Sequence, residues 1–207
     1  MAAKSNLTNM VLVLGVTCLA CSAILGGAYA LTKEPIAAAA AEKTDKAVAR
    51  VLPTFDGTLP RDYVEAVGKT FPYYQAMDDD QTVGYAIEST VVGFGGNLTL
   101  MVGITPDRVV YSTSVLSHSE TPGLGAKCTS DAKFMEQWKG FNPAVKKLAV
   151  RKDGGDVDAI TASTITSRAY TLAVENALAA FDVLNGQSVD AVSGATHTNE
   201  KEESNHE

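Results

Sequence analysis

The segment Asp158-Ala-Ile-Thr-Ala-Ser-Thr-Ile-Thr-Ser167 organises the C-terminal half of this chain. Directly after it, apolar residues recur at the spacing of one helix face: Ala169, Leu172, Ala173, Ala177, Phe181 and Leu184. Thr161, Ser163 and Thr164 therefore fall at or just before the first turn of a predicted helix. Free backbone N–H groups and the positive end of the helix dipole favour a phosphate there. The alternative is that these hydroxyls only cap the helix.

The composition of the 207-residue chain suits one globular domain with an anchoring or targeting segment. Hydrophobic residues make up 45% and charged residues 20%, which is enough apolar material for a packed core. The net charge of -7 argues against nucleic acid as a partner. Cys18 and Cys21 lie in the first apolar run, which leaves Cys128 without a disulfide partner in the globular part. We interpret the first two as packing residues, and no metal site is predicted.

An uncharged, apolar run extends from Met10 to Leu31. A run of roughly twenty such residues is long enough to cross a bilayer. The competing interpretation is a cleaved signal peptide, because Ala28-Tyr29-Ala30 has the form of a cleavage site. The run is longer than the usual signal-peptide core of about 7–15 residues, so we favour a retained anchor. Both interpretations place the residues after Lys33 on the extracytoplasmic side.

Turn signals divide the remainder into short elements. A helix is predicted at 36–52, opened by Pro35 and stopped by Pro53, and residues 54–68 are predicted as loop. A second short helix is predicted at 126–139. Six strands are predicted from alternating and β-branched residues, at 71–75, 82–92, 98–105, 108–116, 147–152 and 157–160. Antiparallel strands with helices at the start, middle and end predict an α+β domain with an antiparallel sheet and flanking helices.

Two loops carry residues with potential for binding or chemistry. Gly93-Phe-Gly-Gly-Asn97 allows close approach of backbone to a ligand, or a bulge, and matches no dinucleotide or Walker fingerprint. Ser117-His-Ser-Glu-Thr-Pro-Gly-Leu-Gly125 is a polar loop closed by a Pro-Gly turn. In it, His118 and Glu120 project together and are candidates for an acid–base pair. We favour a structural role for both, because a histidine beside a carboxylate in a turn is more often structural.

Two motifs give the chain a resemblance to a known family. The segment 158–164 resembles the flavinylation motif of the FMN-binding domain family, Asp-x-x-(Ser/Thr)-Gly-Ala-(Ser/Thr), which Asp158, Thr161 and Thr164 match. Ala162 stands where glycine is usual and Ser163 where alanine is usual. The run from His118 to Gly125 is a complete match to a loop characteristic of the G subunit of the Rnf electron-transport complex and its relatives. The family also includes the C subunit of the sodium-pumping NADH:quinone reductase.

The resemblance implies that Thr164 carries FMN through a phosphoester bond and is not a nucleophile in turnover, so no catalytic residue is predicted. The other residues that it places at the cofactor are Asp158, Thr161, Ser163, His118, Glu120, Thr121, Pro122, Gly123, Leu124 and Gly125. Together with the composition, it divides the chain into a cytoplasmic N-terminus at 1–9, a transmembrane helix at 10–31, a helical linker and loop at 32–68 and an FMN-binding domain at 69–186. The tail at 187–207 lies outside the resemblance and is predicted to be disordered, because it is polar and acidic.

By this resemblance, the protein is a membrane-anchored flavoprotein that relays electrons in an ion-translocating ferredoxin:NAD oxidoreductase. Its implied partners are the other membrane subunits of that complex and, during maturation, a flavin transferase. The implied location is the bacterial inner membrane, with the domain on the extracytoplasmic side. Two alternatives stay open: the FMN subunit of a sodium-translocating NADH:quinone reductase, and an unmodified membrane-anchored binding or assembly module.

The tail contains a second copy of the motif, Asp190-Ala-Val-Ser-Gly-Ala-Thr196, which fits the consensus better by letter. The first copy has a predicted strand before it and an amphipathic helix after it, whereas the second has neither. Because a flavin needs a folded pocket to be held, Thr164 is the predicted acceptor. Thr196 is kept as a second or decoy acceptor.

Overall fold

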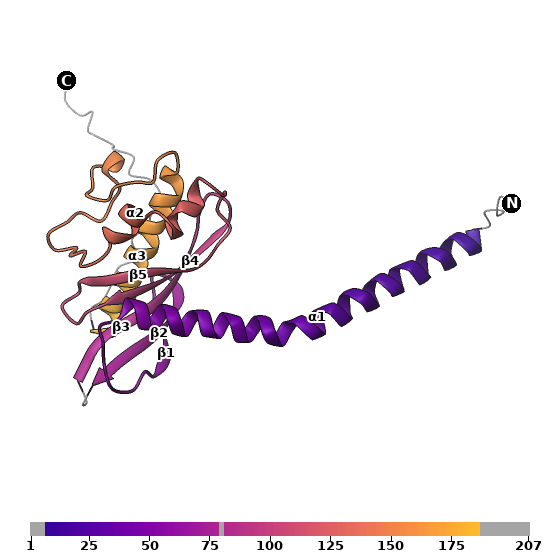
Figure 1. Cartoon of the computed structure of the whole chain (residues 1–207), viewed down its shortest axis with the longest axis horizontal. Helices are drawn as coiled ribbons and strands as arrows, with labels where there is room; N and C mark the ends of the chain where they lie inside the picture. The colour runs from indigo at the N-terminus through magenta and orange to yellow at the C-terminus, as the bar shows by residue number, and fades with distance from the viewer. Residues whose placement is uncertain (1–6, 79–80, 187–207) are drawn as a thin grey trace, which may run out of the picture. The chain divides into compact units, whose positions relative to one another are not determined.

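The computed structural model describes residues 7–78 and 81–186 (Figure 1). The second copy of the motif at 190–196 lies outside these residues. Along the chain, the helices and strands are α1 (Leu7–Val51), β1 (Arg61–Ala66), β2 (Lys69–Asp78), β3 (Gln81–Val92), β4 (Asn97–Ile104), β5 (Val110–His118), η1 (Gly125–Thr129), α2 (Ala132–Glu136), η2 (Arg151–Asp153) and α3 (Thr164–Leu184). The chain forms two compact units that divide between Thr44 and Asp45.

The first unit consists of the exposed part of α1. Among the described residues, α1 is the single helix long and apolar enough to cross a membrane by length and composition. The predicted helix at 36–52 is not a separate element, because α1 continues through Pro35. Proline removes one backbone hydrogen bond from a helix interior, and a long helix tolerates that loss where the freed carbonyl finds another partner.

The second unit is built on a five-stranded antiparallel sheet in the order β1-β2-β3-β4-β5. Each strand pairs with its neighbour in sequence, as in Val64 opposite Phe71 and Ile87 opposite Val102. The predicted α+β class with an antiparallel sheet is confirmed. The sheet is a meander, so its register follows from short local turns.

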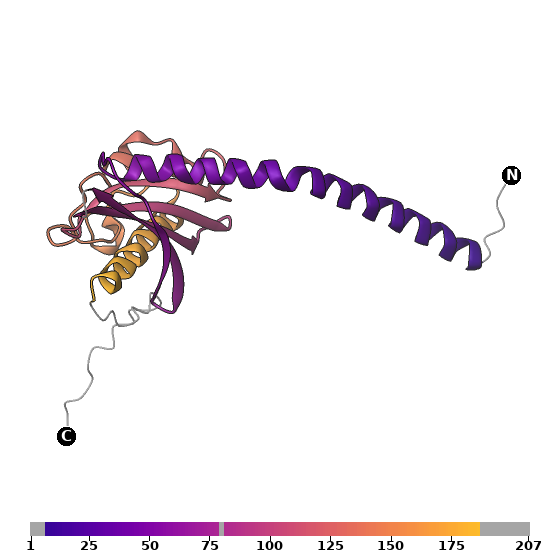
Figure 2. The same cartoon turned by 90° about the horizontal axis from the view of Figure 1, so that it is seen from below.

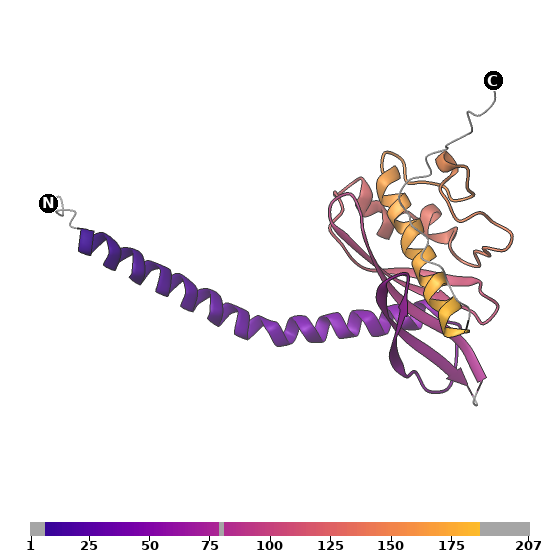
Figure 3. The same ribbon diagram turned by 180° about the vertical axis from the view of Figure 1, so that it is seen from behind.

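Apolar residues cover both faces of the sheet. The last turns of α1 lie over one face and α3 over the other (Figure 2). On one face, α3 packs on β1, β3 and β4 and crosses the strands (Figure 3). The core beneath it includes Trp138, Tyr170 and Phe141, all buried. The opposite face packs against the last turns of α1, where Val48 and Val51 are buried. Burial of a large apolar side chain contributes about 1.5–3 kcal/mol, so both faces stabilise the sheet.

Arg108 ties the β4–β5 turn to the C-terminal part of α3. Its guanidinium donates to both carboxylate oxygens of Asp182, over 2.6 and 2.7 Å. This hydrogen-bonded partner raises the pKa of the arginine side chain. A bidentate pair of this geometry fixes the distance between two elements far apart in the chain. It therefore helps to hold α3 in place over the sheet.

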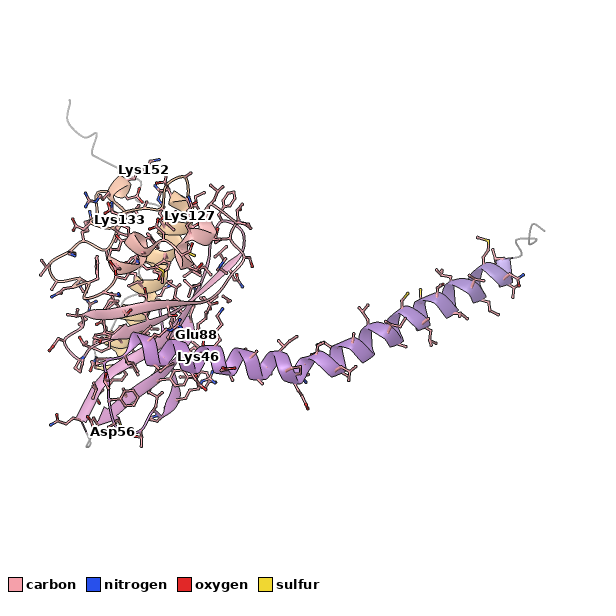
Figure 4. The ribbon with its side chains drawn as sticks, in the orientation of Figure 1. Lys46, Asp56, Glu88, Lys127, Lys133 and Lys152 are labelled. Carbon is pink, nitrogen blue, oxygen red and sulfur yellow. The ribbon has the colours of Figure 1, made fainter. Side chains whose placement is uncertain are left out.

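The connection from β5 to α3 differs most from the sequence-based expectation. The predicted strands at 147–152 and 157–160 are wrong: the segment forms η2 and an isolated parallel bridge between Val150 and Val157. Both valines are buried, and buried β-branched residues give the sequence pattern of a strand. The segment has no neighbouring strand to pair with beyond the single bridge between them. The predicted helix at 126–139 is split into η1 and α2, because the Asp131 side chain accepts the Phe134 N–H and starts a new helix. Lysines of this connection include Lys127, Lys133 and Lys152 (Figure 4).

Strand β1 lies in a segment that the sequence predicted as loop. It alternates exposed Tyr63 and Glu65 with buried Val64 and Ala66, the pattern of a half-buried strand. A tight turn joins it to β2, in which Val67 and Gly68 have φ of 46° and 70°. A β-branched residue with positive φ is unusual, and Val-Gly is not one of the dipeptides typical of a two-residue hairpin turn. The sequence therefore gave little indication of this hairpin.

Candidate functional site

The turn that leads into α3 is held by hydroxyl groups. Ser167 Oγ accepts the Ile160 N–H at 2.9 Å and donates to the Ser163 carbonyl oxygen at 3.0 Å. Ser163 is the N-cap residue, but its side chain makes no capping hydrogen bond. The turn is therefore closed by a residue inside the helix, and Ser163 Oγ is left for other partners.

Thr164 is the first residue of α3 and lines a pocket. It is half-buried, and its hydroxyl makes no hydrogen bond within the part of the chain that the structure describes. By contrast, the hydroxyls of Thr166, Ser167 and Thr171 are buried and bonded to other groups. The first backbone N–H groups of a helix have no acceptor within the helix, and its dipole is positive there. A phosphate joined to Thr164 would lie where these groups stabilise negative charge.

The backbone bends sharply two residues before Thr164. Ala162 has φ of 60°, in the left-handed region where a residue with a Cβ is disfavoured by about 1–2 kcal/mol. This is the position at which the flavinylation motif usually has glycine, which adopts such a conformation without that cost. The turn keeps its shape in this chain despite the alanine, because the Ser167 contacts hold it on both sides.

The pocket in front of Thr164 has a volume of about 340 Å³. Its lining comes from three segments: Phe94 after β3; Glu120, Thr121, Leu124 and Gly125 after β5; and residues 162–166 at the start of α3. The volume is within the range of small-molecule pockets, about 300–1,000 Å³. The loops at 93–97 and 117–125 and the α3 turn thus build one site.

Glu120 joins the three segments beneath the pocket. The residue is 5% exposed. Its Oε1 accepts the Phe94 N–H at 2.8 Å, and its Oε2 accepts the Thr166 hydroxyl at 2.9 Å. Two hydrogen bonds to an ionised group are among the stronger polar interactions in a protein. The carboxylate therefore positions the walls of the pocket instead of facing a substrate.

Two glycines permit this close approach. A Cβ on Gly93 would overlap Glu120 Oε1. A Cβ on Gly125 would lie 2.5 Å from Glu120 Oε2 and 2.6 Å from Thr166 Oγ1. A side chain at either position would displace the Glu120 carboxylate from its hydrogen bonds, so glycine at both positions allows the observed arrangement.

Cys128 lies in the core close to Glu120. Its side chain is fully buried, and this burial raises the pKa of the thiol to about 11, with the negative charge of Glu120 acting in the same direction. The thiol is therefore protonated at neutral pH, which makes it a weak nucleophile. It packs as an apolar residue in the core.

Apolar side chains form the outer edge of the pocket. Phe94 is 68% exposed, Ile165 52% and Leu124 44%. Large apolar groups left in water at the lining of a pocket are typical of a site that covers the apolar surface of a ligand. The arrangement can therefore hold a planar ring system at the edge and a phosphate at the start of α3, which fits FMN.

The structure brings some of the residues predicted from sequence together and leaves others aside. Six of them line the pocket: Glu120, Thr121, Leu124, Gly125, Ser163 and Thr164. Five do not: Asp158, Thr161, His118, Pro122 and Gly123. Asp158 forms an ion pair with Arg151 at 2.7 Å, and His118 Nδ1 accepts the Glu120 N–H at 3.2 Å.

Four lining residues were absent from the sequence-based set: Phe94, Ala162, Ile165 and Thr166. The last three immediately flank the predicted hydroxyls, so their place follows once α3 is known to start at Thr164. Phe94 had a sequence signal, since the glycine-rich segment around it indicated close approach to a ligand. What sequence did not indicate was its hydrogen bond to Glu120.

Comparison with known proteins identifies the family of the chain. Residues 93–179 match the family described as FMN-binding domain. The G subunit of the ion-translocating oxidoreductase complex of Aliivibrio fischeri is 36% identical over 183 residues, which cover 81% of this chain and 86% of the relative. The chain belongs to this G-subunit family. Its globular unit thus contains an FMN-binding domain, and the pocket lies within the matched residues.

Other known proteins are similar to the chain over different lengths. The G subunit of the proton-translocating ferredoxin:NAD(+) oxidoreductase complex of Clostridium ljungdahlii is 33% identical, over 80% of this chain and 86% of that protein. The G subunit of the ion-translocating oxidoreductase complex of Erwinia tasmaniensis is 40% identical, but the match spans 61% of its length and 59% of this chain. A crystal structure of the C subunit of Na(+)-translocating NADH-quinone reductase from Parabacteroides distasonis is 26% identical, with a TM-score of 0.42, over 54% of this chain and 61% of that chain.

Proposed function

We propose that this protein is a membrane-anchored electron-transfer subunit of an ion-translocating ferredoxin:NAD oxidoreductase complex, and that Thr164 carries its FMN covalently. Relatives of the G-subunit family bear the names of such complexes and match most of the chain. The observation that carries the site is the hydroxyl of Thr164, which is unbonded within the described residues and placed at the start of α3 on the wall of the pocket.

Each part of the pocket has a distinct task in this proposal. The first turn of α3 stabilises the charge of the phosphodiester. Phe94, Leu124 and Ile165 cover the apolar surface of the ring system and exclude water from it. Glu120 and Thr166 hold the segments that carry these residues in register. The flavin, when bound, supplies the electron-transfer chemistry, and the chain positions it.

The proposed anchor is the N-terminal part of α1. Residues 10–31 would span about 33 Å as a helix, slightly more than a hydrocarbon core of about 30 Å. The proposed domain boundaries follow: 1–9 in the cytoplasm, 32–68 as linker, 69–186 as the FMN-binding domain and 187–207 as a tail. In this arrangement the flavin lies on the extracytoplasmic side of the bacterial inner membrane. Covalent attachment suits a site from which a free cofactor would diffuse away.

The test is a mass measurement on the full chain produced in a host that contains a flavin transferase. The peptide containing Thr164 is expected to gain the mass of FMN minus water, and the denatured protein to fluoresce in a gel. Thr164→Val should abolish the increment at this position, because it removes the acceptor oxygen and keeps the side-chain volume. Thr70→Val, which removes an exposed hydroxyl from β2 outside both motifs, is the control and should keep it. An unmodified Thr164 peptide in that host would refute the assignment.

A further inference from the structure

Two carboxylates are buried in the described part of the chain, and they differ in their partners. Asp182 is 7% exposed and accepts two hydrogen bonds from the guanidinium of Arg108, so its negative charge is balanced by a positive one. Glu120 is 5% exposed and accepts from the Phe94 N–H and the Thr166 hydroxyl, which are both uncharged. Among the described residues, no lysine or arginine forms an ion pair with Glu120. Glu120 is therefore a buried negative charge that neutral donors stabilise.

The contacts of Glu120 do not by themselves require a charge. Removal of a carboxylate from water lowers the stability of a fold unless a cation compensates for it. A neutral glutamine at position 120 could make the same contacts. Its amide oxygen would accept the Phe94 N–H, and its amide N–H would donate to the Thr166 oxygen, because a hydroxyl can also accept. The hydrogen bonds thus explain a polar side chain at this position, and the charge needs a separate explanation.

The charge of Glu120 acts on the groups around it. On the core side, burial raises the pKa of the Cys128 thiol, and the charge of Glu120 adds to this effect. A second negative charge close to Glu120 is thus disfavoured. On the other side, Glu120 lines the pocket of about 340 Å³ whose wall also contains Thr164. The same repulsion applies to any negative charge that forms in this pocket.

We propose that the charge of Glu120 lowers the reduction potential of the flavin held in the pocket, because it opposes the negative charge that an added electron brings. This inference rests on the proposed function, in which Thr164 carries FMN at this site. Glu120 acts through its charge and itself exchanges neither a proton nor an electron. A lower potential makes the reduced carrier a stronger reductant for its electron acceptor.

Coulomb's law gives the expected size of the effect. At an effective dielectric constant of about 20, two like charges about 10 Å apart repel strongly enough to shift an equilibrium about tenfold. For a one-electron step, a tenfold shift corresponds to about 59 mV. A pocket covered by its ligand contains little water to screen this interaction, so we expect a shift of at least this size.

The test is a redox titration of the full chain with covalent FMN, purified in detergent and reduced stepwise with dithionite without oxygen. Glu120→Gln removes the charge, keeps the side-chain volume and should raise the midpoint potential by about 59 mV or more. Glu120→Asp keeps the charge on a shorter side chain, so it should lose stability but stay near the parent potential. Glu65→Gln removes the same charge from an exposed position of β1. As the matched control, it should leave the potential unchanged.

A second measurement does not depend on the folding of a Glu120 variant. In Thr164→Val, FMN is expected to bind reversibly, and reduction and binding are linked equilibria. A site that lowers the potential must therefore bind reduced FMN more weakly than oxidised FMN, and we expect a difference of about tenfold. Equilibrium dialysis without oxygen measures both affinities. Equal affinities would overturn the inference.

The outcomes distinguish this inference from the proposed function. If Thr164 carries FMN and the potential is the same in the parent and in Glu120→Gln, the inference is wrong and the proposed function stands. If Glu120→Gln and Glu120→Asp raise the potential equally, the contacts of residue 120 set it and its charge does not, which also overturns the inference. A parent chain without FMN on Thr164 would overturn both.

Discussion

The floor and the rim of the pocket differ in their contacts within the protein: polar groups of the floor have hydrogen-bond partners, whereas apolar side chains of the rim are left in water. The floor, formed by Glu120 and Thr166, is buried and hydrogen-bonded. The rim, formed by Phe94, Leu124 and Ile165, exposes apolar surface to water. A satisfied group contributes to folding whether or not a ligand is present, whereas exposed apolar surface gains free energy when a ligand covers it. Stability and cofactor retention should therefore respond to different residues.

Removal of the floor carboxylate is expected to have the largest effect. Glu120→Ala leaves the Phe94 N–H and the Thr166 hydroxyl without their acceptor and opens a cavity. Hydrogen bonds to a charged group contribute about 1.5–3 kcal/mol each, so we expect a loss of about 3 kcal/mol in the free energy of unfolding. Chemical denaturation of the full chain in detergent measures it. Glu65→Ala, on an exposed position of β1, is the control and should change stability by less than about 0.5 kcal/mol. A similarly small change in Glu120→Ala would show that the floor is not a stabilising unit.

Removal of an apolar side chain from the rim should weaken FMN binding and leave the stability of the fold nearly unchanged. In a Thr164→Val background, which leaves FMN to bind reversibly, Phe94→Ala is expected to weaken FMN binding about fivefold to tenfold. Contact between aromatic systems contributes about 0.5–1.5 kcal/mol beyond burial, and Phe94 is 68% exposed without a ligand. Quenching of flavin fluorescence measures the affinity, and the unfolding free energy should stay within about 0.5 kcal/mol. Val92→Ala, which is 76% exposed and does not line the pocket, serves as control. Equal affinity of the Phe94 and Val92 variants would contradict the role of the rim.

The buried thiol of Cys128 predicts a smaller, pH-dependent effect on stability. Burial raises the pKa of Cys128 from 9.0 to about 11 in the folded chain. Between these values the unfolded chain loses the thiol proton while the folded chain keeps it, so the folded state binds more protons and stability falls as pH rises. We expect the free energy of unfolding to decline more steeply between pH 9 and 11 in the parent than in Cys128→Ala. If the free energy of unfolding falls equally with pH in the two proteins, folding does not raise the pKa of the Cys128 thiol.

The smallest expected effect is at the turn between floor and rim. Ala162→Gly relieves a left-handed alanine but also increases the freedom of the unfolded chain, and the two terms nearly cancel. The net stabilisation should be at most about 0.5 kcal/mol. Ala162→Val, with a β-branched residue at φ of 60°, should instead destabilise the chain by more than about 1 kcal/mol. Thermal unfolding of the two variants and the parent gives the sign of each change in stability. A valine variant more stable than the parent would contradict the left-handed conformation at residue 162.

The periodicity of the sequence was sufficient to determine α3, its start at the hydroxyl-rich segment and the α+β class. These features depend on neighbours within a few positions, where a helix repeats every 3.6 residues and a strand every two. The same local patterns were misleading at 147–160, where buried valines imitate a strand, and at 61–66, where a strand begins after a proline-containing loop. In both places the deciding factor is whether a neighbouring strand is present.

Only the tertiary structure decided the composition of the pocket. Phe94 and Thr166 meet Glu120 across 26 and 46 positions of sequence, through hydrogen bonds whose partners no local spacing reveals. The same packing turns Asp158 and His118 toward Arg151 and the Glu120 backbone instead of the pocket. Sequence therefore placed Thr164 at the start of α3, because the beginning of a helix depends on nearby residues. The sheet register and the packing of α3 determined what surrounds it, because those contacts form only when distant segments are folded together.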